Sequence, residues 1–483
     1  MTDGRLWGQP RGIYVLCLVE MWERFSYYGM RALLILYLIE RQQWSDVRAA
    51  LVYGAYTAMV YGFCVLGGWI ADRFVGQWRS IAGGAVLILG GHVGLAVQDL
   101  ATIDPAMAER LLYASLALIV AGTGLFKPSS TTLVGRLYPI DDPNRLTGFH
   151  LFYFGINFGA AISALICGAL AAMFGWGAGL GAAAIGMAFG LGVLLFGRQS
   201  LESVAVAAPP VTLGTVLMPA GMVAAAFALI SFPDAVGVVL VFALVIALAV
   251  ITRFVMHDAT LIERRHVGTA LMLIAAASIF WSLSEQAGSS LNLFAARIVD
   301  LSVGPVRVTA PQLQSLSPAF ILVLTPLLAL LWHRLGKTGR EPGVVWKHVA
   351  GLALVGLGFA CLNLGIALAV SGQRVALWWL VLSYLLQTLG EVCLAPTAYA
   401  AVSRLAPDRI AALMMGLWLF SISIGNFVGA RVATLVARPV AGVGGADEVE
   451  RYATAFGGVA IVAIAAALVL AAVAPRLQRA MAT

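Results

Sequence analysis

The chain has 483 residues, of which 61% are hydrophobic and only 11% are charged, and its mean hydropathy is +0.92. About a quarter of the residues of a water-soluble domain are charged, so this composition excludes a soluble protein and predicts an all-α polytopic membrane protein. The net charge of +7 does not indicate nucleic-acid binding, because no basic run accompanies it, and basic cytoplasmic loops explain it.

Fourteen hydrophobic segments are expected to cross the bilayer as helices. Lys and Arg concentrate in alternate loops between them, which places both termini in the cytoplasm. The first segment is charged in its middle and lacks an Ala-x-Ala site, so it is a retained span and not a signal peptide. The predicted spans are 12–40, 46–73, 80–99, 106–137, 146–173, 177–197, 211–232, 235–256, 266–299, 317–335, 346–371, 376–404, 410–437 and 452–475.

The hydrophobic pattern is interrupted at 198–210, which suggests a seam between two halves. We expect residues 1–200 to form an N-terminal six-helix bundle and residues 261–483 a C-terminal six-helix bundle. Residues 201–260 would supply a linker and an inserted helical hairpin. The segment 211–256 has almost no polar side chains with which to line a pore, so this hairpin should face lipid.

The first span carries Glu20, Glu23, Arg24 and Arg31 at membrane depth. At about 100° per residue, Glu20, Arg24, Tyr27 and Arg31 fall on one stripe, with Glu23 at its edge. Glu20 and Arg24 are i,i+4 partners that can neutralise each other. Such a stripe should face other helices or water. A salt bridge that only orients the helix is the structural alternative, but it would not need two acids, two bases and two tyrosines.

The fourth span contains Lys127 followed by Pro128, with Ser and Thr directly after them. Pro128 removes a backbone donor, and the neighbouring hydroxyls can satisfy the carbonyls that this leaves free. Lys127 lies too far from the predicted ends of the span to reach the interface easily, so we expect it to face a cavity.

Further acids occur in the second half of the chain. We expect Glu285, Ser289 and Asn292 to share one face of a continuous ninth helix, and Glu391 lies in the twelfth span. Each could be a polar clamp between helices. Together with the charges of the first half, they predict a central water-filled cavity in which carboxylates carry protons near neutral pH.

Several motifs, in order along nearly the whole chain, resemble those of the proton-coupled oligopeptide transporter family of the major facilitator superfamily. The matching segments are Glu20-x-x-Glu23-Arg24 with Tyr27-Tyr28-Gly29, Gly67-Gly68-Trp69-Ile70-Ala71-Asp72-Arg73, Gly124-Leu125-Phe126-Lys127-Pro128, Phe152-Tyr153-Phe154-Gly155-Ile156-Asn157-Phe158-Gly159, Phe280-Trp281 with Glu285-Gln286-Ala287-Gly288-Ser289-Ser290, and Leu385-Leu386-Gln387-Thr388-Leu389-Gly390-Glu391. The extra hairpin at 211–256 resembles the bacterial branch of the family.

The resemblance implies a symporter in which two six-helix bundles rock around a central di- or tripeptide site, driven by inward proton flow. It implies proton coupling and gating by the charged residues Glu20, Glu23, Arg24, Arg31, Lys127, Glu285 and Glu391. Arg31 with Glu285 would form the outer gate, and Lys127 with Glu391 the inner gate.

The resemblance also implies a peptide site. Arg24, Tyr28 and Lys127 would hold the peptide carboxylate, and Asn157 and Glu391 the peptide amine. Side-chain pockets would be lined by Tyr61, Tyr153, Trp281, Trp418 and Ser421. The chain departs from the family at Ser317, where an Asn usually precedes the proline of the tenth span. This change puts a shorter hydroxyl near the peptide amine. Ser317 and Glu285 are both expected among the residues that bind the peptide.

The expected partners are a small peptide, protons and the lipid bilayer of the inner membrane, with a monomeric chain, no cofactor besides the proton gradient, no metal, no nucleic acid and no ATP. Leu335-Gly336-Lys337-Thr338 hints at a phosphate loop, but Leu331 occupies the required glycine position. The alternatives are a symporter of the same fold for another small anionic or zwitterionic solute, such as nitrate or an amino acid derivative, or a membrane-embedded enzyme. Scattered histidines without metal spacing or a nucleophile speak against the enzyme.

Overall fold

The computed structural model describes residues 5–100, 103–139, 141–202, 204–205, 210–369, 373–438 and 446–482. Most of these residues are helical, as the composition predicts. The long helices are α1 (Arg11–Leu36), α2 (Asp46–Ile70), α3 (Gln77–Leu100), α4 (Pro105–Arg136), α5 (Arg145–Phe174), α6 (Trp176–Phe196), α8 (Leu213–Ser231), α9 (Pro233–His257), α10 (Leu261–Ser284), α13 (Leu316–Lys337), α14 (Val344–Leu368), α15 (Leu377–Leu405), α16 (Ala411–Thr434) and α17 (Ala446–Ala482).

Short elements connect the long helices. They are the helical segments η1 (Tyr37–Arg41), η2 (Ala71–Val75), α7 (Arg198–Glu202), α11 (Ser290–Arg297), α12 (Ala310–Leu313) and η3 (Asp408–Ile410), and the strands β1 (Arg5–Leu6), β2 (Gln9–Pro10), β3 (Val299–Asp300), β4 (Ser302–Val303), β5 (Val306–Arg307) and β6 (Val375–Ala376). The strands pair as β1 with β2, β3 with β6 and β4 with β5.

Thirteen described helices are long and apolar enough to cross a membrane. Helix α1 is not among them, because Glu20, Glu23, Arg24 and Arg31 lower its hydropathy, but its 26 residues are long enough. All four charged side chains are at most 5% exposed. We therefore count α1 as the fourteenth span, in agreement with the sequence.

The ninth predicted span, 266–299, is not one helix. Helix α10 ends at Ser284 and α11 begins at Ser290. Between them, Gln286 Nε2 donates to the carbonyl oxygens of Ser282 and Gly429, each at 3.1 Å, and so binds the break to α16. The predicted common helical face of Glu285, Ser289 and Asn292 is therefore wrong, because no continuous helix joins these residues.

By their internal contacts the residues form two units. Unit 1 comprises Met1–Gln43, Met59–Phe232 and Pro311–Ala319. Unit 2 comprises Trp44–Ala58, Pro233–Ala310 and Phe320–Thr483. Of the predicted seam at 198–210, residues 203 and 206–209 lie outside the described residues.

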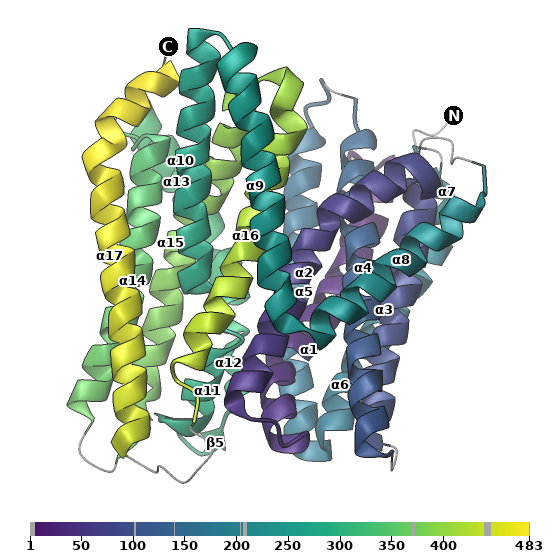
Figure 1. Ribbon diagram of the computed structural model, residues 1–483, viewed down its shortest axis with the longest axis vertical. Coiled ribbons are helices and arrows are strands. Elements are labelled where there is room, and N and C mark those ends of the chain that lie inside the picture. Colours follow the sequence, from purple (N-terminus) through teal and green to yellow (C-terminus); the bar gives the residue numbers. More distant parts are fainter. Residues whose placement is uncertain are drawn as a thin grey trace. The chain divides into compact units, whose positions relative to one another are not determined.

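The same pattern of helix packing occurs in both units. In unit 1, α1 packs against α5 and α6, and α3 packs against α4 and α6. In unit 2, α10 packs against α16 and α17, and α14 packs against α15 and α17 (Figure 1). In each unit, therefore, one helix (α1 or α10) packs against two consecutive long helices (α5 and α6, or α16 and α17), and the second of these also packs against another helix (α3 or α14), which is the mark of an internal structural repeat.

Glycines allow close approach between the helices of unit 1. A Cβ atom on Gly84 of α3 would lie 2.6 Å from the carbonyl oxygen of Gly122 on α4, and a Cβ on Gly122 would lie 2.6 Å from that of Gly84. A Cβ on Gly67 of α2 would lie 2.0 Å from the carbonyl oxygen of Gly124. Small residues are required at these positions because the backbones themselves are in contact.

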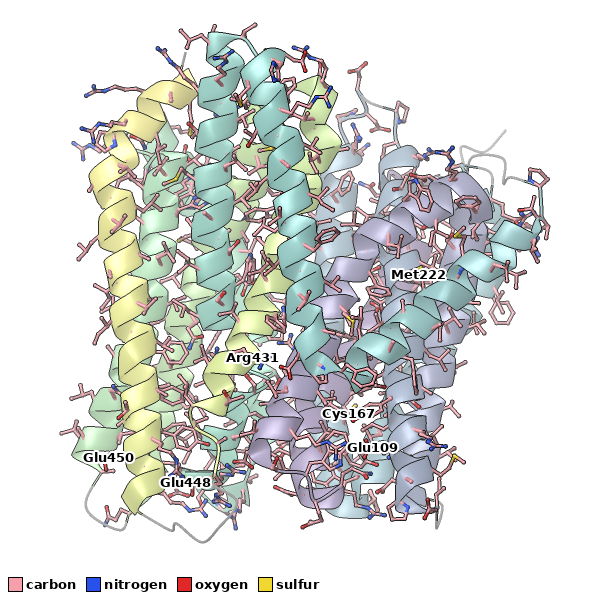
Figure 2. All side chains as sticks on the ribbon, in the orientation of Figure 1. Glu109, Cys167, Met222, Arg431, Glu448 and Glu450 are labelled. Carbon is pink, nitrogen blue, oxygen red and sulfur yellow. The ribbon has the colours of Figure 1, made fainter. Side chains whose placement is uncertain are left out.

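Helices α8 and α9 are largely uncovered, as expected of segments that face lipid. Only 17% and 22% of their most apolar segments are buried, against 72% for α2. Helix α8 contacts α4 in unit 1, and it carries the Met222 labelled in Figure 2. Helix α9 contacts α16 in unit 2, where Arg431 Nη2 lies 2.7 Å from Asp234 Oδ1.

Candidate functional site

Glu20, Glu23 and Arg24 form a buried ionic cluster on α1, each at most 1% exposed. Arg24 binds Glu23 through two hydrogen bonds: Nη2 donates to Oε1 at 2.6 Å, and Nε donates to Oε2. Glu20 Oε1 is farther from Arg24 Nε, at 3.8 Å. The predicted Glu20–Arg24 pair is present, but Glu23 is the main partner because it meets the guanidinium with both carboxylate oxygens.

Glu20 connects this cluster to α4. Its Oε1 lies 3.7 Å from Lys127 Nζ, and its Oε2 accepts a 3.0 Å hydrogen bond from Ser130 Oγ. The Lys127 side chain is 26% exposed, whereas that of Glu20 is 1% exposed. Glu20 and Glu23 carry as many formal charges as Arg24 and Lys127, so the cluster can be neutral although it is buried.

Helix α4 continues through Pro128. Hydroxyl groups after the proline donate to carbonyl oxygens of the preceding turn, from Ser129 to Leu125 and from Thr132 to Pro128, each at 2.9 Å. The carbonyl that Pro128 leaves without its helical donor is that of Gly124, which is packed against Gly67 and receives none of these hydroxyl bonds. The prediction that these hydroxyls satisfy the carbonyl freed by Pro128 is therefore wrong, because they bind other carbonyls of α4.

Aromatic rings extend the cluster along α1. Arg24 Cζ lies 4.9 Å from the centre of the Tyr27 ring and 5.9 Å from that of Tyr28. Arg31, which follows Tyr28 on α1, has its Cζ 5.8 Å from the centre of the Tyr28 ring. The rings stabilise both guanidinium groups by cation–π interactions and hold them in one row.

The remaining predicted residues of unit 1 lie on other elements. Asn157 on α5 is 5% exposed, and its Nδ2 donates to the Tyr153 carbonyl at 3.0 Å. The Tyr153 side chain is 43% exposed. Tyr61 on α2 and Ser317 on α13 are partly buried.

In unit 2, Trp281 and Trp418 are buried, and Glu285 and Glu391 are partly buried. Ser421 Oγ donates to the Trp418 carbonyl at 2.6 Å. The proposed gates, Arg31 with Glu285 and Lys127 with Glu391, join residues of different units, so they stay predictions.

Sequence reasoning missed two features. Ser130 is predicted only to be a hydroxyl near Pro128, although its position three residues after Lys127 could have suggested a partner on another helix. A second ionic cluster in unit 2 was also missed, since its members occur singly at the ends of predicted spans. Within it, Arg297 Nη1 and Nη2 donate to the two carboxylate oxygens of Asp46, at 2.6 and 2.8 Å.

The unit 2 cluster is continued by Arg438 and Glu448. The Arg438 backbone N–H donates to Asp46 at 2.8 Å, and its guanidinium donates twice to Glu448, also at 2.8 Å. Burial acts to lower the pKa of Arg297, but its hydrogen bonds with Asp46 outweigh burial and hold that pKa above its ordinary value. Arg297 therefore stays charged at every physiological pH.

Among the described residues, no group of three His, Cys, Asp or Glu side chains is placed to hold a metal ion. The chemistry open to the α1–α4 cluster is the exchange of ionic partners and of protons on its two carboxylates, since a buried acid can be neutralised by a cation or by a proton.

A family model described as the POT family matches residues 78–449. The chain belongs to the POT family. This confirms the identification made from the motifs, and with it the major facilitator fold of the family's transporters. The chain is 32% identical to the uncharacterized transporter YclF of Bacillus subtilis (strain 168), with 98% of this chain and 95% of the relative covered.

Two further POT relatives are informative. The chain is 32% identical to dipeptide and tripeptide permease A of Erwinia pyrifoliae, over 89% of this chain and 87% of the permease. It is also similar to the crystal structure of a mutant peptide transporter POT in complex with alafosfalin, with a TM-score of 0.85 and 32% identity. That match covers 99% of this chain and 97% of the other. The resemblance therefore spans the whole transporter and not one motif.

Proposed function

We propose that this POT protein is a proton-coupled symporter that imports di- and tripeptides across the inner membrane by alternating access. The observation that carries this function is the four-member cluster of Glu20, Glu23, Arg24 and Lys127, in which only Lys127 is partly exposed. A cluster with equal numbers of acids and bases gains a net positive charge when one carboxyl takes a proton. The positive charge can then attract the carboxylate of a peptide.

The cluster gives each residue a role. Protonation of Glu23 releases Arg24, whose two hydrogen bonds to Glu23 are the shortest contacts of the cluster, and the freed guanidinium binds the peptide carboxylate with Tyr28 and Lys127. Glu20 pairs with Lys127 until the peptide carboxylate takes the place of Glu20 as the partner of Lys127. Proton uptake and peptide binding therefore favour each other, which is what coupled transport requires.

The other end of the peptide would be bound mainly by residues of the second half of the chain. Glu391 with Asn157, near Ser317, would bind the peptide amine, and the aromatic residues Trp281 and Trp418 would accommodate its side chains. Arg31 with Glu285 would close the outer gate and Lys127 with Glu391 the inner gate. A dipolar ligand bound in this way draws the two halves together.

We propose that residues 1–200 and 261–483 act as the two moving bundles, with residues 201–260 as an inserted hairpin. Both termini would be cytoplasmic, because the basic loops alternate with loops that hold about half as many basic residues. A monomer is sufficient for this cycle. The proton gradient is the only energy source it needs, without ATP, a metal or a cofactor.

The test is a competition uptake panel in proteoliposomes, run with and without an inward proton gradient. Labelled dialanine is the substrate, and di-, tri- and tetrapeptides, amino acids and nitrate are the competitors. We expect competition by di- and tripeptides and an uptake rate that rises at least tenfold with the gradient. Competition by nitrate or amino acids alone would assign the protein to another solute, and uptake without any gradient dependence would exclude symport.

A further inference from the structure

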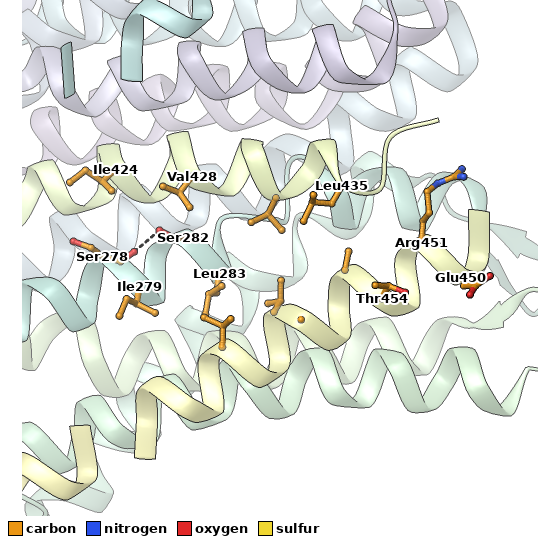
Figure 3. A pocket seen from close by; sticks show the side chains of 15 residues that line it. Ser278, Ile279, Ser282, Leu283, Ile424, Val428, Leu435, Glu450, Arg451 and Thr454 are labelled. Carbon is orange, nitrogen blue, oxygen red and sulfur yellow. Dashed lines mark hydrogen bonds between the residues drawn. The ribbon is translucent and has the colours of Figure 1, made fainter. Parts of the chain in front are cut away.

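A large groove lies on the surface of unit 2, and none of the residues that line it belongs to the ionic clusters described above. Its volume is about 1010 Å³, and it is bounded by α10, α16 and α17 (Figure 3). Along most of its length the lining is aliphatic, with Ile279, Leu283, Val428 and Val462 among the residues that face it. Drug-sized ligands occupy pockets of about 300–1,000 Å³, so this groove is large enough for a long flexible molecule.

The groove is polar at one end, where α17 begins. Glu450, Arg451 and Thr454 line it there, and their side chains leave α17 in different directions (Figure 3). The two hydroxyls deeper in the groove are already used, since Ser278 Oγ donates to the Ile274 carbonyl at 2.9 Å and Ser282 Oγ to the Ser278 carbonyl at 2.7 Å. Hydrogen-bonding capacity for a ligand is therefore concentrated at the rim.

Arg451 is the unsatisfied group at this rim. Its Nε and Nη2 atoms are shielded from water, and neither has a hydrogen-bond acceptor among the described residues. Its side chain as a whole is partly buried. A guanidinium has five N–H donors in a planar fork that matches a phosphate, and leaving such donors unpaired away from water is costly.

We propose that this groove binds one glycerophospholipid, with its acyl chains along α10, α16 and α17 and its phosphate on Arg451. An acyl chain is as apolar inside the groove as in the bilayer, so burial of the chains alone gives no reason for a lipid to stay. Charge complementarity between the phosphate and Arg451 supplies that reason. Glu450, on a neighbouring side of the helix, favours a headgroup that also carries donors, such as the hydroxyls of phosphatidylglycerol.

The groove has a site at which its volume can be changed without harm to the packing. Gly458 of α17 lines it, and a Cβ atom at this position would meet nothing within 4 Å. Gly458→Leu should therefore fill the groove and leave the helices in place. Gly268 of α10 also has open space around its Cβ and does not line the groove, so Gly268→Leu is the matched control.

The experiment is native mass spectrometry of the full-length protein, delipidated and then titrated with phosphatidylglycerol. We expect one tightly retained lipid on the wild type and on Gly268→Leu. Its apparent affinity should fall at least tenfold in Arg451→Gln and in Gly458→Leu, and Arg451→Lys should restore part of it. Arg307→Gln, which removes an exposed arginine from the β4–β5 hairpin, should stay within twofold of the wild type.

Two other ligands separate the parts of the proposal. Diacylglycerol with the same chains should bind at least fivefold more weakly than phosphatidylglycerol, and inorganic phosphate should not displace the lipid. Equal retention of diacylglycerol would contradict the contact with Arg451. Unchanged binding in Gly458→Leu would exclude the groove, and unchanged binding in Arg451→Gln would overturn the proposal. If Arg451→Gln fails to fold, Gly458→Leu still tests whether the lipid occupies the groove, and diacylglycerol still tests whether the phosphate is needed. None of these outcomes depends on peptide transport.

Discussion

Arg297 and Asp46 form a two-pronged ion pair within unit 2, with both guanidinium Nη atoms within 2.8 Å of the carboxylate. The pair joins α11 to the first turn of α2, and the Asp46 side chain is only 5% exposed. A pair buried to this extent stabilises the fold mainly because each charge would be costly without the other.

The first prediction concerns this pair. Asp46→Ala should destabilise the protein by about 3–5 kcal/mol, because it leaves Arg297 buried without its main partner. The exposed i,i+4 pair of Arg198 and Glu202 is the control, and Arg198→Gln should change stability by less than about 1 kcal/mol. Thermal unfolding of the purified protein in detergent measures both. Similar shifts in the two variants would contradict the structural role of the buried pair.

The pH dependence of the same pair has a definite sign. Because the pKa of Arg297 is held above its ordinary value, its contribution to stability is fully present below that ordinary value and is lost only in strong base. Short of strong base, the pair is therefore broken only on the acid side, by protonation of the Asp46 carboxylate. The difference in melting temperature between the wild type and Asp46→Ala should persist to pH 9 and shrink toward pH 3.

Two adjacent glycines of α3 should differ sharply in their tolerance of substitution. A Cβ on Gly84 would lie 2.6 Å from the Gly122 carbonyl oxygen, whereas a Cβ on Gly83 would meet nothing within 4 Å. Gly84→Ala should therefore lower the melting temperature or abolish folded expression, and Gly83→Ala should leave both unchanged. Fluorescence-detected size-exclusion chromatography with a thermal ramp compares the two. Equal tolerance would mean that α3 and α4 can separate without cost.

The hydrogen bond between Ser130 and Glu20 provides another matched pair of variants. Ser130→Ala removes the donor to a buried carboxylate, which costs about 1–3 kcal/mol in such a place. Ser129→Ala removes only a hydroxyl bonded to the Leu125 carbonyl of its own helix. Proton-driven dipeptide uptake should fall several-fold in the first variant and by less than twofold in the second. The reverse order would exclude Glu20 from the coupling step.

Glu23→Gln should abolish proton-driven uptake and leave peptide exchange measurable. The glutamine amide in this variant cannot take up a proton and so cannot release Arg24 in response to the gradient. Exchange of peptide inside the proteoliposomes for peptide outside needs no net proton movement and should continue. Uptake under a gradient and counterflow without one, measured on the same proteoliposomes, separate the two activities. Equal loss of both would assign Glu23 to peptide binding or to folding.

Lys127→Ala should weaken the binding of dipeptides most when the peptide carboxylate is intact. An amidated dipeptide lacks this carboxylate and cannot form an ion pair with Lys127. Its affinity should therefore change little in the variant. Competition binding of both ligands to wild type and variant gives the comparison. If the amidated peptide lost as much affinity as the free acid, Lys127 would not bind the carboxylate.

The polar stripe of the first span was predictable, but its pairing was not. A helical wheel ranks Glu20 above Glu23 as the partner of Arg24, because residues one apart point in different directions. The long guanidinium side chain nevertheless bends back to its neighbour and binds both carboxylate oxygens. Side-chain reach, which a wheel does not represent, decides the pairing.

The break after α10 shows a different limit. The hydrophobicity of 266–299 is continuous, so local patterns predict one helix. The interruption is stabilised by Gln286, whose amide binds the Gly429 carbonyl on a helix that follows 143 residues later. A contact between such distant positions leaves no periodic trace in the sequence. Most of the long apolar helices could be located to within a few residues, but α17 extends beyond both ends of the predicted span 452–475.

The burial of four charges in α1 bears on how the chain is synthesised. Each charged residue at the centre of a lone helix opposes insertion by the translocon by about 2.5–3.5 kcal/mol, so α1 is the helix least able to remain in the bilayer alone. The helices that cover it, α5 and α6, are translated more than a hundred residues later. The charged side chains of α1 must therefore be kept away from lipid until α5 and α6 have been synthesised and can pack against it.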